Sequence, residues 1–131
     1  MLIEKLKIFP EEIEARNLVA ARYCDALAEV AIVPRAGNES TSVWAQYTIR
    51  VQPGKRDALA AALKAQGIPT AIYYTKPLHR QPAYRHFPLA EGGVPVSDRL
   101  ADEVVSLPMH AYLEPPVQGH IIESVRRALA N

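Results

Sequence analysis

Hydrophobic and polar positions follow helical spacing at the start of this chain and extended spacing further on. From Leu2 the apolar residues recur on one helical face, and Pro10 suits the first turn of a second helix that runs to about residue 28. No capping residue precedes Leu2, so we expect this first helix to be the remainder of a longer one. From Val43 to Val51 small or apolar residues occupy every second position, which predicts the clearest strand of the chain.

The middle of the sequence alternates between short extended segments and a helix. Residues 31–33 predict a short strand, and residues 55–66 predict a helix. Gly67 can take the positive φ that ends this helix, and Pro69 prevents the helix from continuing. Residues 70–74 are β-branched and aromatic, and therefore favour another short strand.

The last third of the sequence adds two more helices. Ser97 predicts the N-cap of a helix that runs to about Val104, and residues 104–107 fit either its last turn or a further strand. Two prolines at 115–116 introduce the final helix. The pattern predicts the α+β class, an α/β sandwich in which helices cover a small antiparallel or mixed sheet. At 131 residues, the whole chain, residues 1–131, has the size of one domain.

Composition narrows the classes of partner. The chain is 49% hydrophobic with a formal net charge of +1, which indicates neither nucleic acid nor a charged membrane surface as a partner. No apolar run approaches the roughly 20 residues that cross a bilayer. Cys24 is the single cysteine, so an internal disulfide is impossible and a cytoplasmic location is expected.

The best candidate for chemistry is the polar and aromatic loop that follows residues 70–74. Tyr73, Tyr74 and His79 could donate hydrogen bonds to sugar hydroxyls or phosphate oxygens. The competing interpretation is purely structural: Tyr73 enters the core, Tyr74 covers it, and His79 lies in solvent. The residue pattern by itself favours this structural interpretation, because one histidine is weak evidence for a site.

Other kinds of site have less support. Residues 76–87 are basic and interleaved with aromatic residues, as in some RNA-binding loops, yet no RNA-binding motif accompanies them. The four histidines are scattered and have no paired cysteines, so no zinc site is predicted. His110 could face a ligand, but the apolar residues and proline around it favour a structural turn.

Four segments in order carry a resemblance to a known family. They are the opening LKIFPEEIEAR, the strand SVWAQYTIRV, the loop from Gly67 to Tyr84 with PLHRQPAY, and VSDRLADEVVSLPMH up to His110. Together they resemble the C-terminal small domain of the DegT/DnrJ/StrS sugar aminotransferases over essentially the whole chain. The residues of these segments are most similar to those of the branch that aminates UDP-2-acetamido-2-deoxy-3-oxo-glucuronate for surface polysaccharide synthesis.

The resemblance implies a small, mostly antiparallel sheet covered by helices, as in the small domain of a fold-type I enzyme. Such an enzyme depends on pyridoxal 5′-phosphate (PLP) and works as a homodimer. Glutamate would donate the amino group, and a UDP-keto-sugar would receive it. The lysine and the acidic residue that such an enzyme uses belong to its large domain, and neither maps onto this sequence. We therefore expect no catalytic, cofactor-binding or metal-binding residue here, no PLP bound to this chain alone, and no activity in isolation.

The residues that the resemblance does transfer are Tyr73, Tyr74 and His79, which match substrate-facing positions of the family. The role of Lys76 stays open between a contact with nucleotide phosphates and exposure to solvent. An isolated small domain would also expose apolar surface and could self-associate. The alternative is a non-catalytic module that binds sugar nucleotides or another partner and derives from the same domain.

Overall fold

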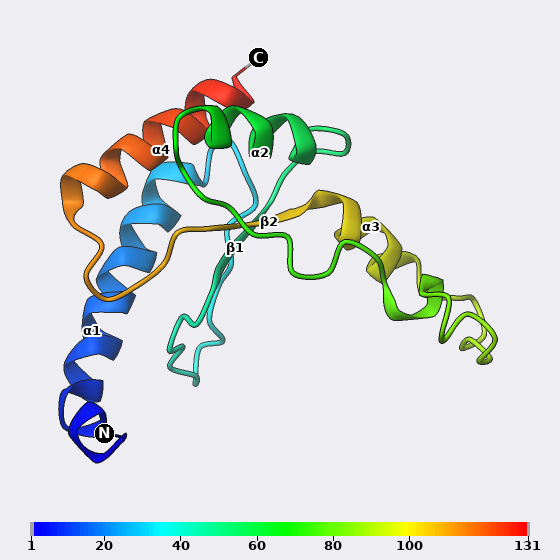
Figure 1. Cartoon of the computed structure of the whole chain (residues 1–131), viewed down its shortest axis with the longest axis horizontal. Helices are drawn as coiled ribbons and strands as arrows, with labels where there is room; N and C mark the ends of the chain where they lie inside the picture. Colours follow the sequence, from blue (N-terminus) through cyan, green and yellow to red (C-terminus); the bar gives the residue numbers. More distant parts are fainter. Residues whose placement is uncertain (1, 131) are drawn as a thin grey trace.

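The computed structural model describes residues 2–130 and divides them into a helical body and a projecting arm (Figure 1). The elements in chain order are α1 (Leu2–Leu27), β1 (Tyr47–Arg50), α2 (Arg56–Ala65), the 3-10 helix η1 (Leu78–Arg80), α3 (Pro95–Glu103), β2 (Val104–Leu107) and α4 (Pro115–Leu129). Helices α1, α2 and α4 gather around the two strands, while the loop after α2 and helix α3 extend away from them. We call residues 75–103 the arm.

The sheet confirms the predicted fold class, since β1 and β2 pair antiparallel with Tyr47 opposite Leu107 and Arg50 opposite Val104. Residues 104–107 are thus a strand, which the sequence had left undecided. Single bridges extend this pair at Ile32 and Ala71, where full strands were predicted.

The core lies between the sheet and the three helices of the body. Tyr47 is fully buried against Tyr23 of α1, with ring centroids 4.8 Å apart. Burial raises the pKa of both phenols, so both stay neutral. Leu63 of α2 and Val125 of α4 are also fully buried, which shows how the predicted apolar stripes of these helices form the core.

Helix α1 is continuous, and the predicted division into two helices at Pro10 is wrong. A proline inside a helix removes the hydrogen bond to the carbonyl four residues earlier, which here belongs to Leu6. This turn is exposed, so water can satisfy the carbonyl that Pro10 leaves free. The two turns of α1 before Pro10 are exposed and lie outside the core. No helix among residues 2–130 is long and apolar enough to cross a membrane.

The predicted strand over residues 43–51 is shorter than expected because of Trp44. Its φ is 46°, in the left-handed region, and strand geometry begins only at Tyr47. Contacts with α1 replace the missing ladder: Trp44 Nε1 donates to Asn17 Oδ1 at 2.9 Å, and Arg16 donates to the Trp44 carbonyl at 3.0 Å. The Trp44 ring packs at a tilt against Tyr47, with ring centroids 5.6 Å apart, so both rings help to join the strand to α1.

A small polar cluster ties α1 to the loop before α4. Lys5 donates to the Glu12 carboxylate, and Tyr112 donates to the same group at 2.6 Å. These two hydrogen bonds, first from Lys5 and then from Tyr112, lower the pKa of Glu12. The side chain of Glu12 is 7% exposed, so its carboxylate is largely shielded from water.

Candidate functional site

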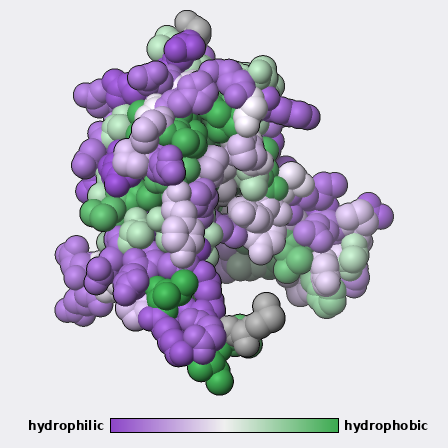
Figure 2. All heavy atoms as spheres, turned by 60° about the vertical axis from the view of Figure 1, so that its left-hand side comes forward, coloured by the Kyte–Doolittle hydropathy of each residue, from purple (hydrophilic) through white to green (hydrophobic). Residues whose placement is uncertain are grey.

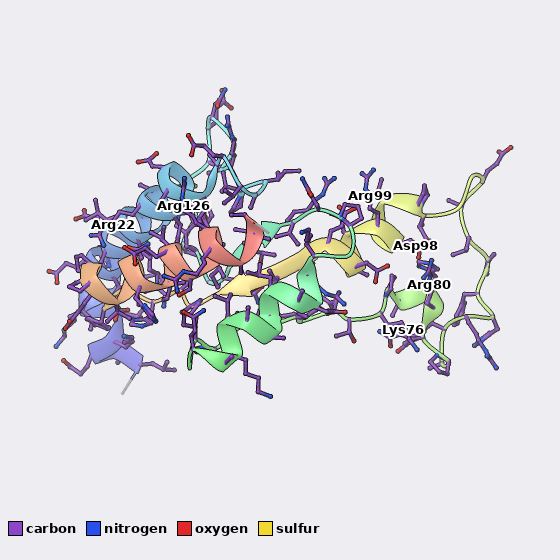
Figure 3. The ribbon with its side chains drawn as sticks, turned by 90° about the horizontal axis from the view of Figure 1, so that it is seen from above. Arg22, Lys76, Arg80, Asp98, Arg99 and Arg126 are labelled. Atoms are coloured by element: carbon purple, nitrogen blue, oxygen red, sulfur yellow. The ribbon has the colours of Figure 1, made fainter. Side chains whose placement is uncertain are left out.

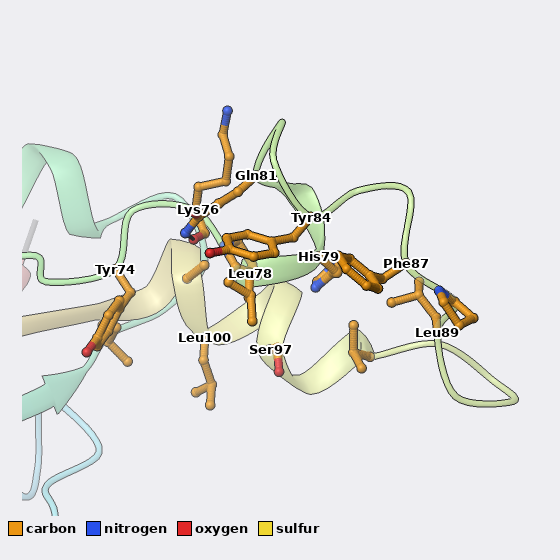
Figure 4. Close-up of a pocket in the computed structure, with 15 residues that line it drawn as sticks. Tyr74, Lys76, Leu78, His79, Gln81, Tyr84, Phe87, Leu89, Ser97 and Leu100 are labelled. Carbon is orange, nitrogen blue, oxygen red and sulfur yellow. Dashed lines mark hydrogen bonds between the residues drawn. The ribbon is translucent and has the colours of Figure 1, made fainter.

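The arm contains a pocket of about 860 Å³ between the loop of residues 74–89 and helix α3 (Figure 4). We call it the arm pocket. Its lining is mainly aromatic and aliphatic, and includes Tyr74, Leu78, Tyr84, Phe87, Leu89 and Leu100. Polar groups reach it from His79, Lys76 and Gln81. An apolar concave surface with a few polar groups is the usual form of a small-molecule site.

Helix α3, which forms one wall of the arm pocket, begins differently from the prediction. Its first residue is Pro95, preceded by Val94, and no side chain caps it. Ser97 is therefore inside the helix and lines the arm pocket, so its prediction as the N-cap is wrong. Proline at the first position needs no partner for a backbone N–H and fixes a helical φ, which explains the earlier start.

A hydrogen-bond contact with α3 holds His79 in η1. Its Nε2 lies 2.8 Å from Asp98 Oδ1, and the His79 side chain is only 17% exposed. Arg80 Nε lies 2.6 Å from the same carboxylate oxygen. His79 is thus a fixed wall of the arm pocket, in contrast to the solvent position of the structural interpretation.

The two candidate tyrosines do not share a pocket. Tyr74 lines the arm pocket, whereas Tyr73 lines a separate cavity of about 200 Å³ beside Ser106 and Leu107 of β2. Neighbouring side chains of an extended segment point to opposite sides, which accounts for the separation. Tyr73 is 57% exposed, so it is not the core residue that the structural interpretation required, and Tyr74 is 80% exposed. The structure therefore brings together Tyr74 and His79 but not Tyr73.

Two further residues of the site were not predicted as site residues. Tyr84 and Phe87 line the arm pocket, with ring centroids 6.3 Å apart, although the sequence suggested only a solvated or RNA-binding loop. Asp98, in the first turn of α3, was not predicted as a site residue either. His110, which the sequence left open, is exposed after β2 and does not line the arm pocket.

The residues of the arm pocket do not fit PLP by themselves. A PLP enzyme needs a lysine for the imine, an acid beside the pyridine nitrogen and a site for the phosphate. The lining of the arm pocket contains one lysine, Lys76, and no carboxylate, and no lysine of residues 2–130 is buried. Residues 2–130 also contain no group of histidine, cysteine and acidic side chains that could hold a metal ion.

Apolar surface continues around the pocket on the outer part of the arm (Figure 2). Leu78 is 62% exposed and Phe87 58% exposed. Both residues line the arm pocket, so its aromatic and aliphatic wall is open to the surface.

Solved structures define the class of this fold. Residues covering 99% of the chain superpose on a DegT/DnrJ/EryC1/StrS aminotransferase from Brucella abortus with a TM-score of 0.93 at 47% identity. The same share of the chain superposes with a TM-score of 0.90 at 31% identity on S. venezuelae DesV, whose crystal structure contains a ketimine intermediate. The fold matches fold-type I sugar aminotransferases over about a third of the length of those chains.

Sequence comparison gives the family. Residues 1–126 match the DegT/DnrJ/EryC1/StrS aminotransferase family, and the chain belongs to it. It is 44% identical over 115 residues to the UDP-2-acetamido-2-deoxy-3-oxo-D-glucuronate aminotransferase of Pseudomonas aeruginosa. It is 35% identical to the UDP-N-acetyl-3-dehydro-alpha-D-glucosamine 3-aminotransferase of Acidithiobacillus ferrooxidans. The match covers 87% of this chain but 31% of the Pseudomonas enzyme, so the chain spans about a third of that relative.

Proposed function

We propose that this chain forms the C-terminal, substrate-side small domain of a PLP-dependent sugar-nucleotide aminotransferase. The supporting observation is the superposition on the Brucella abortus aminotransferase over 99% of the chain at 47% identity. The 44% identity to the Pseudomonas enzyme supports a UDP-linked 3-keto-sugar as the acceptor, in surface polysaccharide synthesis. Glutamate as amino donor, a homodimeric enzyme and a cytoplasmic location complete the proposal.

In this proposal the arm contributes substrate contacts, and residues outside the 131 supply PLP. Tyr74 and His79 would donate or accept hydrogen bonds at the hydroxyls of the sugar nucleotide from the wall of the arm pocket. Tyr73 would contact it from the neighbouring cavity beside β2, or from the rim between the two. No lysine of residues 2–130 is buried, which supports the view that the imine-forming lysine lies elsewhere.

A chimera tests the proposal. The segment of the Pseudomonas enzyme that matches this chain is replaced by residues 1–126, and transfer from glutamate to UDP-2-acetamido-2-deoxy-3-oxo-D-glucuronate is measured. We expect a PLP-loaded chimera with activity. Tyr74→Phe and His79→Gln should each lower kcat/KM by about 3- to 10-fold, the cost of one neutral hydrogen bond. His120→Gln, at an exposed histidine of α4, is the matched control and should change nothing.

Two results would contradict the proposal. A folded, PLP-loaded chimera that aminates no keto-sugar would exclude the function, and full activity of His79→Gln would exclude the site. The isolated 131-residue chain should bind no PLP and transfer no amino group.

A second function class is a non-catalytic sugar-nucleotide-binding or interaction module, favoured by the absence of a carboxylate from the lining of the arm pocket. An inactive chimera that still binds the UDP-sugar would support this module.

A further inference from the structure

Asp98 joins the two walls of the arm pocket through one oxygen atom (Figure 3). Its Oδ1 lies 2.8 Å from His79 Nε2 and 2.6 Å from Arg80 Nε. The carboxylate stands in the first turn of α3, whereas its two partners lie in η1, 19 and 18 residues earlier. The Asp98 side chain is 29% exposed, so water competes only in part for these contacts.

This geometry determines which nitrogen of His79 carries the proton. An ionised carboxylate can only accept hydrogen bonds, so Nε2 must be the donor to Asp98. In the neutral imidazole Nδ1 is then unprotonated and can accept a hydrogen bond. Because Nε2 is engaged with Asp98, Nδ1 is the ring nitrogen left for a ligand of the arm pocket.

Arg80 offers a competing explanation of Asp98. Its guanidinium could make Asp98 a simple ionic link between η1 and α3, with His79 only a neighbour of that link. Arg80 is 56% exposed, however, and exposed ion pairs contribute little. The His79 side chain is 17% exposed, so the shielded contact of Asp98 is the one with the imidazole.

We propose that Asp98 is a positioning residue that acts through His79, holding it as the Nε2–H tautomer so that Nδ1 accepts a hydrogen bond from a ligand hydroxyl in the arm pocket. The identity of that ligand, a hydroxyl-rich sugar nucleotide, rests on the proposed function. The tautomer of His79 does not, and it can be measured without any activity.

Nitrogen-15 NMR of the histidine side chains in the 131-residue chain tests the tautomer. At a pH where His79 is neutral, we expect one dominant form protonated at Nε2. Asp98→Asn should mix the two tautomers, because an amide can accept from Nε2 or donate to it. Asp98→Glu should restore the Nε2–H form, and Asp102→Asn, at an exposed aspartate of the same helix, is the matched control.

Arg80→Gln separates the two explanations. If Asp98 acts through His79, this variant should keep the Nε2–H tautomer. Loss of that tautomer in Arg80→Gln to the same extent as in Asp98→Asn would overturn the proposal. An Nδ1–H tautomer in the unmodified chain would overturn it as well, even if Asp98→Asn does not fold.

Kinetics of the chimera then connect the tautomer with the ligand. Asp98→Asn should lower kcat/KM by about 3- to 10-fold at unchanged PLP content, but should have no further effect in the His79→Gln background. If the losses in kcat/KM caused by Asp98→Asn and His79→Gln were additive in the double variant, Asp98 would not act through His79. An inactive chimera with the expected tautomer would contradict the proposed function and leave the positioning by Asp98 confirmed.

Discussion

The base of the arm depends on a shielded ion pair whose two members should respond differently to substitution. Glu103, the last residue of α3, is 3% exposed in its side chain, and its Oε2 lies 2.5 Å from Nε of Arg50 in β1. Arg50 is 33% exposed and can reach water without its partner. Removing the arginine therefore leaves a buried charge, whereas removing the carboxylate leaves a partly solvated one.

We expect Arg50→Met to lower the free energy of unfolding by about 3 kcal/mol, the lower end of the range for breaking a buried pair. The lower end applies because Arg99 Nε lies 4.0 Å from Glu103 Oε2. The Arg99 side chain is 54% exposed, so it can turn toward the carboxylate and replace the lost charge of Arg50 in part. Methionine keeps most of the apolar stem of arginine, so the loss of stability reflects the removed charge and not lost packing. Glu103→Gln should cost only about 1 kcal/mol, because its amide oxygen still accepts from Arg50.

Urea denaturation of the 131-residue chain measures both values, with unchanged m-values as evidence that the denatured state is unaffected. Arg127→Met is the control, since Arg127 is exposed on α4, and it should stay within about 0.5 kcal/mol of the original chain. A loss of less than about 1 kcal/mol for Arg50→Met, or a larger loss for Glu103→Gln, would refute the reasoning from unequal burial.

Two further predictions concern the body. Hydrogen bonds from Lys5 and Tyr112 lower the pKa of Glu12 from its ordinary 4.5. The ionised Glu12 therefore stabilises the folded state above pH 4.5, and this stabilisation is lost as the pH falls through the lowered pKa. Glu12→Gln should thus be destabilising near neutral pH, and the difference in urea midpoint should shrink well below pH 4.5; a constant difference would contradict this. Gly67→Ala should cost about 1 kcal/mol, because φ is +74°. Gly119→Ala in α4, where an added Cβ has no atom within 4 Å, should stabilise by about 0.5 kcal/mol; equal thermal midpoints for the two variants would refute this assignment.

Elements with strong local signals were predictable from the sequence. Gly67 ends α2 with a positive φ as predicted, and the pair of prolines at 115–116 begins α4. The period-two pattern correctly identified Tyr47 to Arg50 as a strand. In each case neighbouring residues alone determine the conformation, through backbone freedom or side-chain alternation.

Where the prediction was wrong, distant contacts or solvent outweighed the local signal. Trp44 continues the alternation in sequence, yet it has a left-handed φ and donates a hydrogen bond to Asn17, 27 residues earlier. Pro10 is tolerated inside α1 because the turn around it faces water. Residues 70–74 form only one bridge, at Ala71, because the chain then turns away into the arm.

The arm pocket itself illustrates why a site is harder to predict than a helix. The loop that contains Tyr74 and His79 was identified from residue types alone, but the division of Tyr73 and Tyr74 between two cavities was not. Asp98 gave no sign of its contact with His79, since acidic residues are ordinary in a first helical turn. Such contacts depend on how η1 packs against α3, which no short segment encodes.

Helix α3 connects these observations, because it contacts the body at one end and the pocket loop at the other. At its C-terminal end Glu103 binds Arg50, and Arg56 of α2 donates to the carbonyl of Ala101, one of the carbonyls that a helix end leaves unpaired. At its N-terminal end Asp98 holds His79. A single helix of nine residues thus sets where the imidazole stands relative to the sheet. Since both ends depend on buried or half-buried carboxylates, the position of His79 follows from the polar contacts of Asp98 and Glu103 more than from buried apolar side chains, which are few in the arm.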